Sequence, residues 1–257
     1  MAFQFISPMC DNKDVFECAI FTMTRTYALG FNSNVINLVG SFLNSRQQCV
    51  KFSGEFSTYK PIDVGAPQGT KLGPILWLIY VNDLKAEGFN CVKYADDTTF
   101  YKPIVNLTDD NVSDAISNAN SWSLENSMLL NSSKTVVLNI AFSDRPGMNF
   151  DVNPSDDTFI SPSKSAKLLG VTVDSQLSFS DHIDSVVSKC NSRLYLMKQL
   201  KTMGMNTAGL ITFYAANVKP VLSYACPVWF QFISEADKEK LEKVQRYATR
   251  MSTMTID

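Results

Sequence analysis

Apolar and polar residues alternate with recognisable periods along the first third of the chain. Residues 34–44 place four apolar side chains on one stripe at helical spacing, which predicts an amphipathic helix. Residues 47–64 alternate as a strand does and are interrupted by Ser-Gly at 53–54, which predicts a β-hairpin. A loop rich in Gly and Pro then leads into the apolar residues 74–84. Because Pro74 suits the first turn of a helix, this run predicts a buried helix.

The middle of the chain carries short strand patterns around one helical pattern. Residues 89–104 predict two short strands joined by a tight turn at Asp96-Asp97. Residues 109–129 place small and apolar side chains on a repeating face, which predicts a helix. The apolar run 135–142 predicts a buried strand.

The character of the chain changes towards its C-terminal end. Residues 166–174 predict a last strand, broken at Gly170. From residue 180 onward, apolar residues recur at helical spacing with basic residues mostly elsewhere. We therefore predict an α+β fold: an antiparallel sheet backed by helices over 1–178, followed by an α-helical region over 179–257.

Composition narrows the class of protein. The chain has 257 residues, of which 45% are hydrophobic, and a net charge of −2, so it can bury a sizeable core and shows no global basic excess. Between residues 185 and 250, however, ten Lys or Arg face four Asp or Glu. Six scattered cysteines without a Cys-x-x-Cys pair, and a single histidine, argue against a zinc site.

The sequence also suggests where the protein works. The N-terminus has no basic region typical of a signal peptide, and the longest apolar run is too short to span a bilayer. Scattered thiols suit a reducing compartment. We expect a soluble, intracellular protein of the cytoplasm or nucleus, without a transmembrane segment or membrane partner.

The candidate chemistry lies in residues 94–101, Tyr-Ala-Asp-Asp-Thr-Thr-Phe-Tyr. Asp is a poor strand former, and two adjacent carboxylates repel each other. A divalent cation would offset that repulsion, and carboxylate oxygens are the ligands that Mg²⁺ prefers. Taken alone, such a pair is more often an ordinary surface turn. The surrounding segments decide between the two interpretations.

Six segments in consistent order resemble blocks of one enzyme family. They are residues 94–101, 65–84 with its Pro-Gln-Gly loop, 130–135, 166–183, 216–229 and 241–250. Together they closely resemble the reverse transcriptases of non-LTR (LINE-type, jockey-like) retrotransposons, from about residue 30 onward. The resemblance implies a reverse-transcriptase palm with a primer-grip-like hairpin over 1–178 and a thumb-like region over 179–257. A viral RNA-dependent RNA polymerase would share the chemistry, but usually has Gly where this chain has Ala95.

The resemblance also implies roles for residues of the central segments. Asp96 and Asp97 would hold the catalytic Mg²⁺ (or Mn²⁺) ions, and Tyr94 and Ala95 would line the primer terminus. Gln68 and Gly69 would lie against the template and the incoming nucleotide, where a small residue allows close approach. Both could instead be ordinary turn residues.

Two further residues take implied roles in the later segments. Lys134 would donate a proton to the leaving pyrophosphate, although an exposed lysine at this position needs no such role. Gly170 would lie in the primer-grip hairpin. His182, the single histidine, is expected to cap or flank the helix that starts near Ser180, without a catalytic role.

The third carboxylate of the family is expected near the N-terminus. There the sequence Asp-Asn-Lys-Asp-Val-Phe-Glu, residues 11–17, is a degraded match to Asp-x-x-x-Ala-Phe-Asp. Asp11 would be the third metal ligand, with Asp14 as the alternative, and Glu17 would replace the second Asp. Phe16 would reject a ribose 2′-hydroxyl. The family carries a fingers region upstream of this motif, and we expect a truncated reading frame that lacks it.

Two functions of different classes remain open from the sequence. The first is an RNA-directed DNA polymerase that binds an RNA template, a DNA primer and dNTPs and extends the primer 3′-OH by two-metal nucleotidyl transfer. The second is a catalytically inactive remnant that binds nucleic acid weakly through its basic helical end. A helical interaction module over residues 180–250 is a third possibility. The oligomeric state does not follow from the sequence.

Overall fold

The computed structural model describes residues 2–6, 8–9, 15–61, 69–104, 112–126, 128–131, 134–141 and 162–253. The chain forms two compact units. Unit 1 comprises Met1–Val137 with Met148–Pro162, and unit 2 comprises Leu138–Gly147 with Ser163–Asp257. Helices and antiparallel strands occur together, so the α+β prediction is confirmed at that level. The predicted domain boundary at residue 178 remains a prediction.

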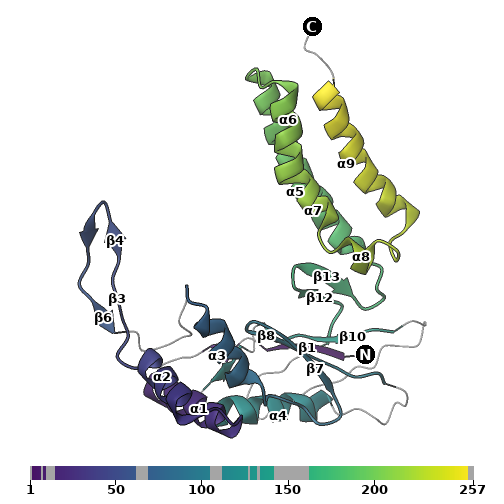
Figure 1. The fold of residues 1–257 in the computed structure, drawn as a ribbon. Helices are drawn as coiled ribbons and strands as arrows, with labels where there is room; N and C mark the ends of the chain where they lie inside the picture. Colours follow the sequence, from purple (N-terminus) through teal and green to yellow (C-terminus); the bar gives the residue numbers. More distant parts are fainter. Residues whose placement is uncertain are drawn as a thin grey trace. The chain divides into compact units, whose positions relative to one another are not determined.

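Unit 1 is built on an antiparallel sheet in which β1 (Ala2–Ile6), β8 (Asp97–Tyr101) and β7 (Asn90–Tyr94) lie side by side in that order (Figure 1). β8 is a central strand, because it pairs with β1 on one edge and with β7 on the other. Its middle residues are correspondingly buried, and Phe100 is only 1% exposed. Burial of such a ring contributes about 2–3 kcal/mol.

Four helices accompany this sheet: α1 (Val15–Ala28), α2 (Ser33–Leu43), α3 (Leu72–Val81) and α4 (Val112–Glu125). The small side chains on one face of α4, Ala115 and Ala119, pack against Phe100 of β8. The amphipathic helix predicted for residues 34–44 is confirmed as α2, which Asn32 caps by accepting the N–H of Val35 at 3.0 Å.

Helix α3 confirms the helix predicted after the Gly/Pro loop, but it is less buried than predicted. It begins at Leu72, two residues before Pro74, and ends at Val81. Its burial is one-sided, because Ile75 and Leu78 are 52% and 56% exposed. A continuous apolar sequence therefore does not make this helix buried all round; only the packing of neighbouring elements decides which face is covered.

Residues 47–61 form a two-stranded ribbon, which confirms the predicted hairpin. β3 (Gln47–Gln48) pairs with β6 (Lys60–Pro61), and β4 (Lys51–Phe52) pairs with β5 (Glu55–Phe56). Ser53 and Gly54 both have positive φ, 49° and 93°, as a two-residue type I′ turn requires. A further short pair, β2 (Pro8–Met9) with β9 (Leu129–Leu130), also belongs to unit 1.

Unit 2 begins with strands. β10 (Val137–Asn139) and β11 (Pro162–Ser163) are neighbours in sheet order and lie where the chain passes between the units. β12 (Ser165–Leu168) and β13 (Val171–Asp174) form a tight antiparallel hairpin. The predicted break at Gly170 is the turn of this hairpin, so residues 166–174 contribute to two antiparallel strands and not to one continuous strand.

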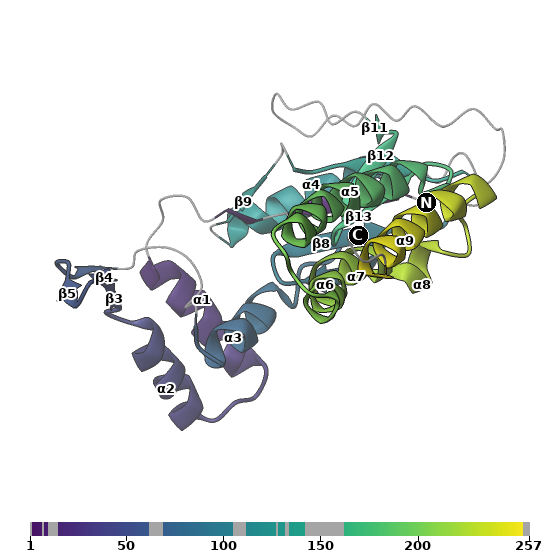
Figure 2. The ribbon, with the colours of Figure 1, turned by 90° about the horizontal axis from the view of Figure 1, so that it is seen from above.

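The helices of unit 2 form the larger part of it. They are α5 (Ser180–Thr202), α6 (Thr207–Phe213), the π-helical turn η1 (Tyr214–Val218), α7 (Lys219–Ser223), α8 (Cys226–Trp229) and α9 (Glu235–Thr253). Figures 1 and 2 show α5 and α9 side by side, and Cys190, Leu194, Val244 and Ala248 pack in their shared core. None of the helices in the described residues is long and apolar enough to cross a membrane.

The entry into α5 is fixed by one carboxylate. Asp174 accepts backbone N–H groups of Gln176, Ser178 and Phe179 at 2.9, 3.0 and 2.6 Å. Burial by itself raises the pKa of Asp174, but these hydrogen bonds outweigh it and hold the pKa below its ordinary value.

Replacing Asp174 by Ala should lower the free energy of unfolding by about 1–3 kcal/mol, because three N–H groups lose their acceptor. The pKa of Asp174 is lower in the folded chain than in the unfolded chain. Its contribution is therefore present at pH 7 and is lost as the pH falls from about 4 through the folded value. Urea denaturation of wild type and Asp174→Ala at pH 7 and pH 3 measures this, with Asp181→Asn as the control. An equal stability difference at both pH values would contradict it.

Candidate active site

The carboxylate pair lies at the tip of the β7–β8 hairpin. Tyr94 ends β7 and pairs directly with Asp97, the first residue of β8. The two-residue turn is therefore Ala95-Asp96, and the predicted turn at Asp96-Asp97 is wrong by one residue. Asp97 stays in the extended conformation because it begins a strand that is paired along both edges, which a local sequence pattern does not reveal.

Adjacent positions give the two aspartates different surroundings. Asp96 is exposed in the turn, whereas Asp97 is partly buried at the start of the central strand. Burial raises the pKa of Asp97 above its ordinary value, the charge of Asp96 raises it further, and the charge of Lys134 opposes both. The ionised form of Asp97 is thus disfavoured in the protein itself. A cation at this tip would relieve that cost.

Besides Tyr94 and Ala95 of the hairpin itself, the structure brings the predicted site residue Lys134 close to the pair, as its electrostatic effect on Asp97 indicates. It is exposed, and its backbone N–H is held by Asn131, whose side-chain Oδ1 accepts it at 3.2 Å. Tyr94, at the end of β7, is 64% exposed. A basic side chain, an aromatic ring and two carboxylates therefore share the accessible tip of unit 1.

Trp77 of α3 also reaches this turn, and sequence reasoning missed it. Its indole Nε1–H donates to the backbone oxygen of Ala95 at 2.6 Å. Trp77 belongs to an apolar run that predicted only a helix. The sequence signal was the single aromatic N–H donor within that run, because a partly buried indole N–H usually has a partner.

The two predicted glycines occupy positions that demand Gly for different reasons. Gly69 has φ +74°, although a Cβ there would meet nothing within 4 Å, so conformation alone restricts it. Gly170 has φ +88°, and a Cβ would also lie 3.2 Å from the ring of Tyr224. The hydroxyl of Tyr224 donates to the oxygen of Leu169 at 2.6 Å, so this ring is fixed over the β12–β13 turn within unit 2.

The remaining predicted site residues lie wholly or partly outside the residues that the structure describes. Asp11, Asp14 and Gln68 lie outside them, and of Phe16 only the backbone, in the first turn of α1, is described. β1 runs antiparallel to β8 with Ile6 opposite Thr98. The chain therefore leaves β1 at the end of the sheet where β8 begins.

The described residues fit a divalent cation only in part. Asp96 and Asp97 supply the hard oxygen donors that Mg²⁺ or Mn²⁺ requires. Within the described ranges, however, no three His, Cys, Asp or Glu side chains gather as a metal site. A complete site would need a further ligand from outside them, such as the predicted Asp11.

His182 has a structural role. It lies within the first turn of α5, is 4% exposed, and its Nδ1 accepts the N–H of Thr172 at 3.3 Å. Its ring meets that of Trp229 edge to face at a centroid distance of 5.7 Å, and Nε2 is buried without a hydrogen-bond partner. Burial, reinforced by Lys189, lowers the pKa of His182. It therefore packs α5 against β13 and does not cap the helix.

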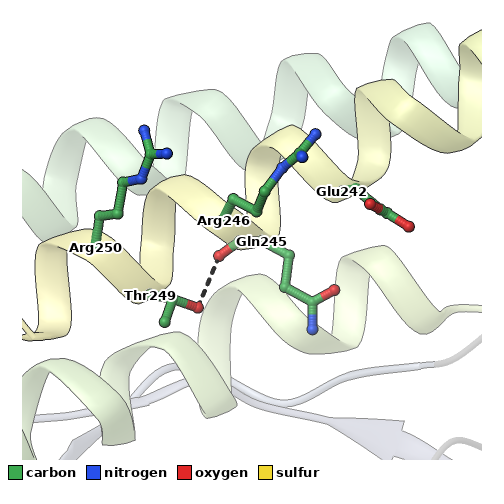
Figure 3. Close-up of a pocket in the computed structure, with 5 residues that line it drawn as sticks. All are labelled: Glu242, Gln245, Arg246, Thr249 and Arg250. Atoms are coloured by element: carbon green, nitrogen blue, oxygen red, sulfur yellow. Dashed lines mark hydrogen bonds between the residues drawn. The ribbon is translucent and has the colours of Figure 1, made fainter.

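Helix α9 carries a separate polar groove in unit 2. The groove has a volume of about 450 Å³ and is lined by Glu242, Gln245, Arg246, Thr249 and Arg250 (Figure 3). Thr249 Oγ1 donates to the backbone oxygen of Gln245 at 3.0 Å, and Arg246 pairs with Glu239. From residue 243 to 250 the helix has three basic residues and no acidic one. This face therefore offers guanidinium groups to an anion.

The chain belongs to the reverse transcriptase family. The family model described as "Reverse transcriptase (RNA-dependent DNA polymerase)" matches residues 21–173, which include the β7–β8 hairpin, Lys134 and Gly170. Asp11 and Phe16 precede the matched residues, so their roles remain predictions.

The similar proteins come from mobile elements, as the resemblance indicated. The chain is 27% identical over 222 residues to "RNA-directed DNA polymerase from mobile element jockey" of Drosophila melanogaster, which covers 81% of this chain and 23% of that protein. It is 23% identical over 230 residues to "Probable RNA-directed DNA polymerase from transposon X-element" of the same species, covering 84% and 24%. The chain thus spans about a quarter of the length of the curated relatives it matches.

Replacing Asp97 by Asn should raise the melting temperature of the metal-free protein at pH 7. The pKa of Asp97 is higher in the folded than in the unfolded chain, so its ionisation costs stability as the pH rises through that interval. The cost is present above the folded pKa and fades as the pH falls below the unfolded value of about 3.9, so the variants should converge towards pH 3. Thermal denaturation with EDTA at both pH values measures this, with exposed Glu87→Gln as the control. A variant less stable than wild type at pH 7 would contradict it.

Proposed function

We propose that this chain supplies the palm and a thumb-like region of an RNA-directed DNA polymerase. The observation that carries the proposal is the Asp96-Asp97 pair at an accessible hairpin tip, in a chain of the reverse transcriptase family, with Asp97 ionised at a cost. The polymerase would extend a DNA primer on an RNA template with dNTPs. Residues 1–178 would form the palm with the primer-grip-like hairpin, and 179–257 the thumb-like region.

Asp96 and Asp97, with Asp11 as the expected third ligand, would hold Mg²⁺ or Mn²⁺. When bound, such ions lower the pKa of the attacking hydroxyl and neutralise charge on the leaving pyrophosphate. The carboxylates would sit in line with the primer terminus because Tyr94 and Ala95 flank them at the same tip. Lys134, whose charge already acts on Asp97, would hold a proton for the pyrophosphate.

The remaining predicted residues would position the nucleic acid and the nucleotide. Gln68 and Gly69 would lie against the template and incoming dNTP, and Phe16 would exclude a 2′-hydroxyl. Gly170, in the β12–β13 turn, would belong to the primer grip. These roles come from the family resemblance.

Helix α9 suits the phosphate backbone of the template–primer. Its C-terminal half carries Lys243, Arg246 and Arg250, and both guanidinium groups line the polar groove beside Glu242, with Arg246 paired to Glu239. Guanidinium groups bind phosphate oxygens through paired N–H donors, which gives affinity without sequence selectivity. An otherwise acidic chain would thereby hold nucleic acid on one basic face.

A second candidate function is that of an inactive remnant that binds nucleic acid weakly. One observation favours it: among the described residues, no third metal-binding side chain gathers with the aspartate pair. Metal binding and catalysis then become separable, because two carboxylates alone can bind one cation without positioning the two cations of a two-metal mechanism.

Primer extension tests the polymerase directly. Wild type, with an RNA template, a DNA primer, dNTPs and Mg²⁺ or Mn²⁺, should extend the primer, and Asp96→Ala/Asp97→Ala should reduce the rate at least about 10²-fold, because charge stabilisation is lost. Glu87→Gln serves as the control. Equal rates for wild type and the double variant would refute the site. A folded wild type that binds Mn²⁺ without extension would favour the remnant.

Replacing Arg246 and Arg250 together by Ala should weaken nucleic-acid binding. It should also reduce the magnitude of the slope of log K against log salt by about 1–2, because binding with fewer phosphate contacts releases fewer counterions. Fluorescence anisotropy of a labelled template–primer between about 50 and 200 mM salt measures the slope. Lys198→Ala/Lys219→Ala, two exposed lysines of the same unit, form the control. Equal slopes in both double variants would contradict the assignment to α9.

A further inference from the structure

A single hydrogen bond connects helix α3 to the turn that carries the aspartates. Trp77 Nε1 lies 2.6 Å from the backbone oxygen of Ala95, 18 positions away in sequence. Trp77 is partly buried, whereas Ala95 and Asp96 are exposed. The bond therefore reaches from the packed part of unit 1 to its accessible tip.

This bond acts on the orientation of Asp96. The oxygen of Ala95 and the N–H of Asp96 belong to the same planar peptide, so fixing one end fixes the plane from which the Asp96 side chain departs. Ala95 has φ +51°, a left-handed conformation that a residue with a Cβ seldom adopts. Such a conformation persists when its surroundings hold it, and the Trp77 N–H is one group that does so.

Trp77 is itself held by its neighbours. Its ring stacks on Tyr80 with centroids 6.1 Å apart and an interplanar angle of 21°. The hydroxyl of Tyr80 donates to the oxygen of Asn126 at 2.5 Å. At the end of α3, Lys93 Nζ donates to the oxygens of Val81 and Asn82 at 2.5 and 3.1 Å. Helix α3, which carries the donor, is thus held by Asn126 directly after α4 and by Lys93 of β7.

We infer that Trp77 is a positioning residue for the proposed metal site, whose indole N–H sets the peptide plane that aims the Asp96 carboxylate. The inference rests on the proposed function of Asp96 and Asp97 as metal ligands. Trp77 touches neither metal nor nucleotide in this role; it acts only through Ala95. Its effect should therefore appear in the turn even when no metal is present.

The test uses Trp77→Phe, which keeps an aromatic ring and removes the N–H. The matched control is Trp229→Phe in unit 2, which loses an equivalent indole bond, 2.9 Å, to the oxygen of Tyr224. In metal-free protein, hydrogen exchange over residues 94–97 should accelerate about tenfold in Trp77→Phe and stay unchanged in Trp229→Phe, as expected for one hydrogen bond. Mn²⁺ affinity should fall about five- to tenfold in Trp77→Phe alone, and kcat should fall without a rise in KM for dNTP.

The outcomes separate this inference from the proposed function. Unchanged exchange over residues 94–97 in Trp77→Phe overturns the inference, even if the wild type binds Mn²⁺ and extends primers. If exchange accelerates in Trp77→Phe but the wild type binds no Mn²⁺, the result supports the role of Trp77 in fixing the turn and refutes the metal site. If Trp77→Phe does not fold, ¹⁵N-indole spectra of wild type and Asp96→Asn decide. A Trp77 N–H resonance protected from exchange in both supports the bond, and rapid exchange overturns it.

Discussion

The buried guanidinium of Arg25 is the constraint on which the helices of unit 1 depend. It lies over the rings of Tyr80 and Trp122, 4.9 and 5.5 Å from their centroids. It donates to Asp83 at 2.8 Å and to Asn126 at 2.5 Å, with a side chain only 15% exposed. A buried charge is tolerated only when it is paired and hydrogen-bonded. Its partners lie on or beside α3 and α4, so one guanidinium joins α1, α3 and α4, although its Nη1 is buried without a hydrogen-bond partner among the described residues.

Contacts from this core also hold the hairpin tip in place. Tyr80, which Arg25 covers, stacks on Trp77, and Trp77 holds the peptide before Asp96. The tip itself is electrostatically unfavourable, since Asp97 is ionised against burial and against Asp96. A rigid scaffold can hold two repelling carboxylates together, whereas an isolated hairpin would relax. Stability is thus lower at the place where a cation would be bound, as is common at functional sites.

In unit 2, a buried carboxylate joins helices as the guanidinium of Arg25 does in unit 1. The carboxylate of Asp237, in a residue that is 3% exposed, accepts the hydroxyls of Ser180 and Ser234 at 3.0 and 2.8 Å and pairs with Lys240 at 2.9 Å. The bond from Lys240 is the first cause that lowers the pKa of Asp237, and bonds to Asp184 and Asp237 raise the pKa of Lys240 to about 12. The starts of α5 and α9 are joined at this carboxylate. The basic face of α9 is therefore presented from a fixed helix pair.

The sequence by itself determined the local elements and the chemistry of the tip. Ser53-Gly54 predicted the turn of a hairpin, and helical spacing predicted α2 and α4. The adjacent aspartates and their motif order identified the family. Only the tertiary structure decided that Asp97 starts the strand while Asp96 lies in the turn, because the pairing of β8 with β1 sets that register. It also decided that α3 is covered on one face only and that Trp77 meets Ala95. Both depend on contacts between residues far apart in sequence, which no local pattern encodes.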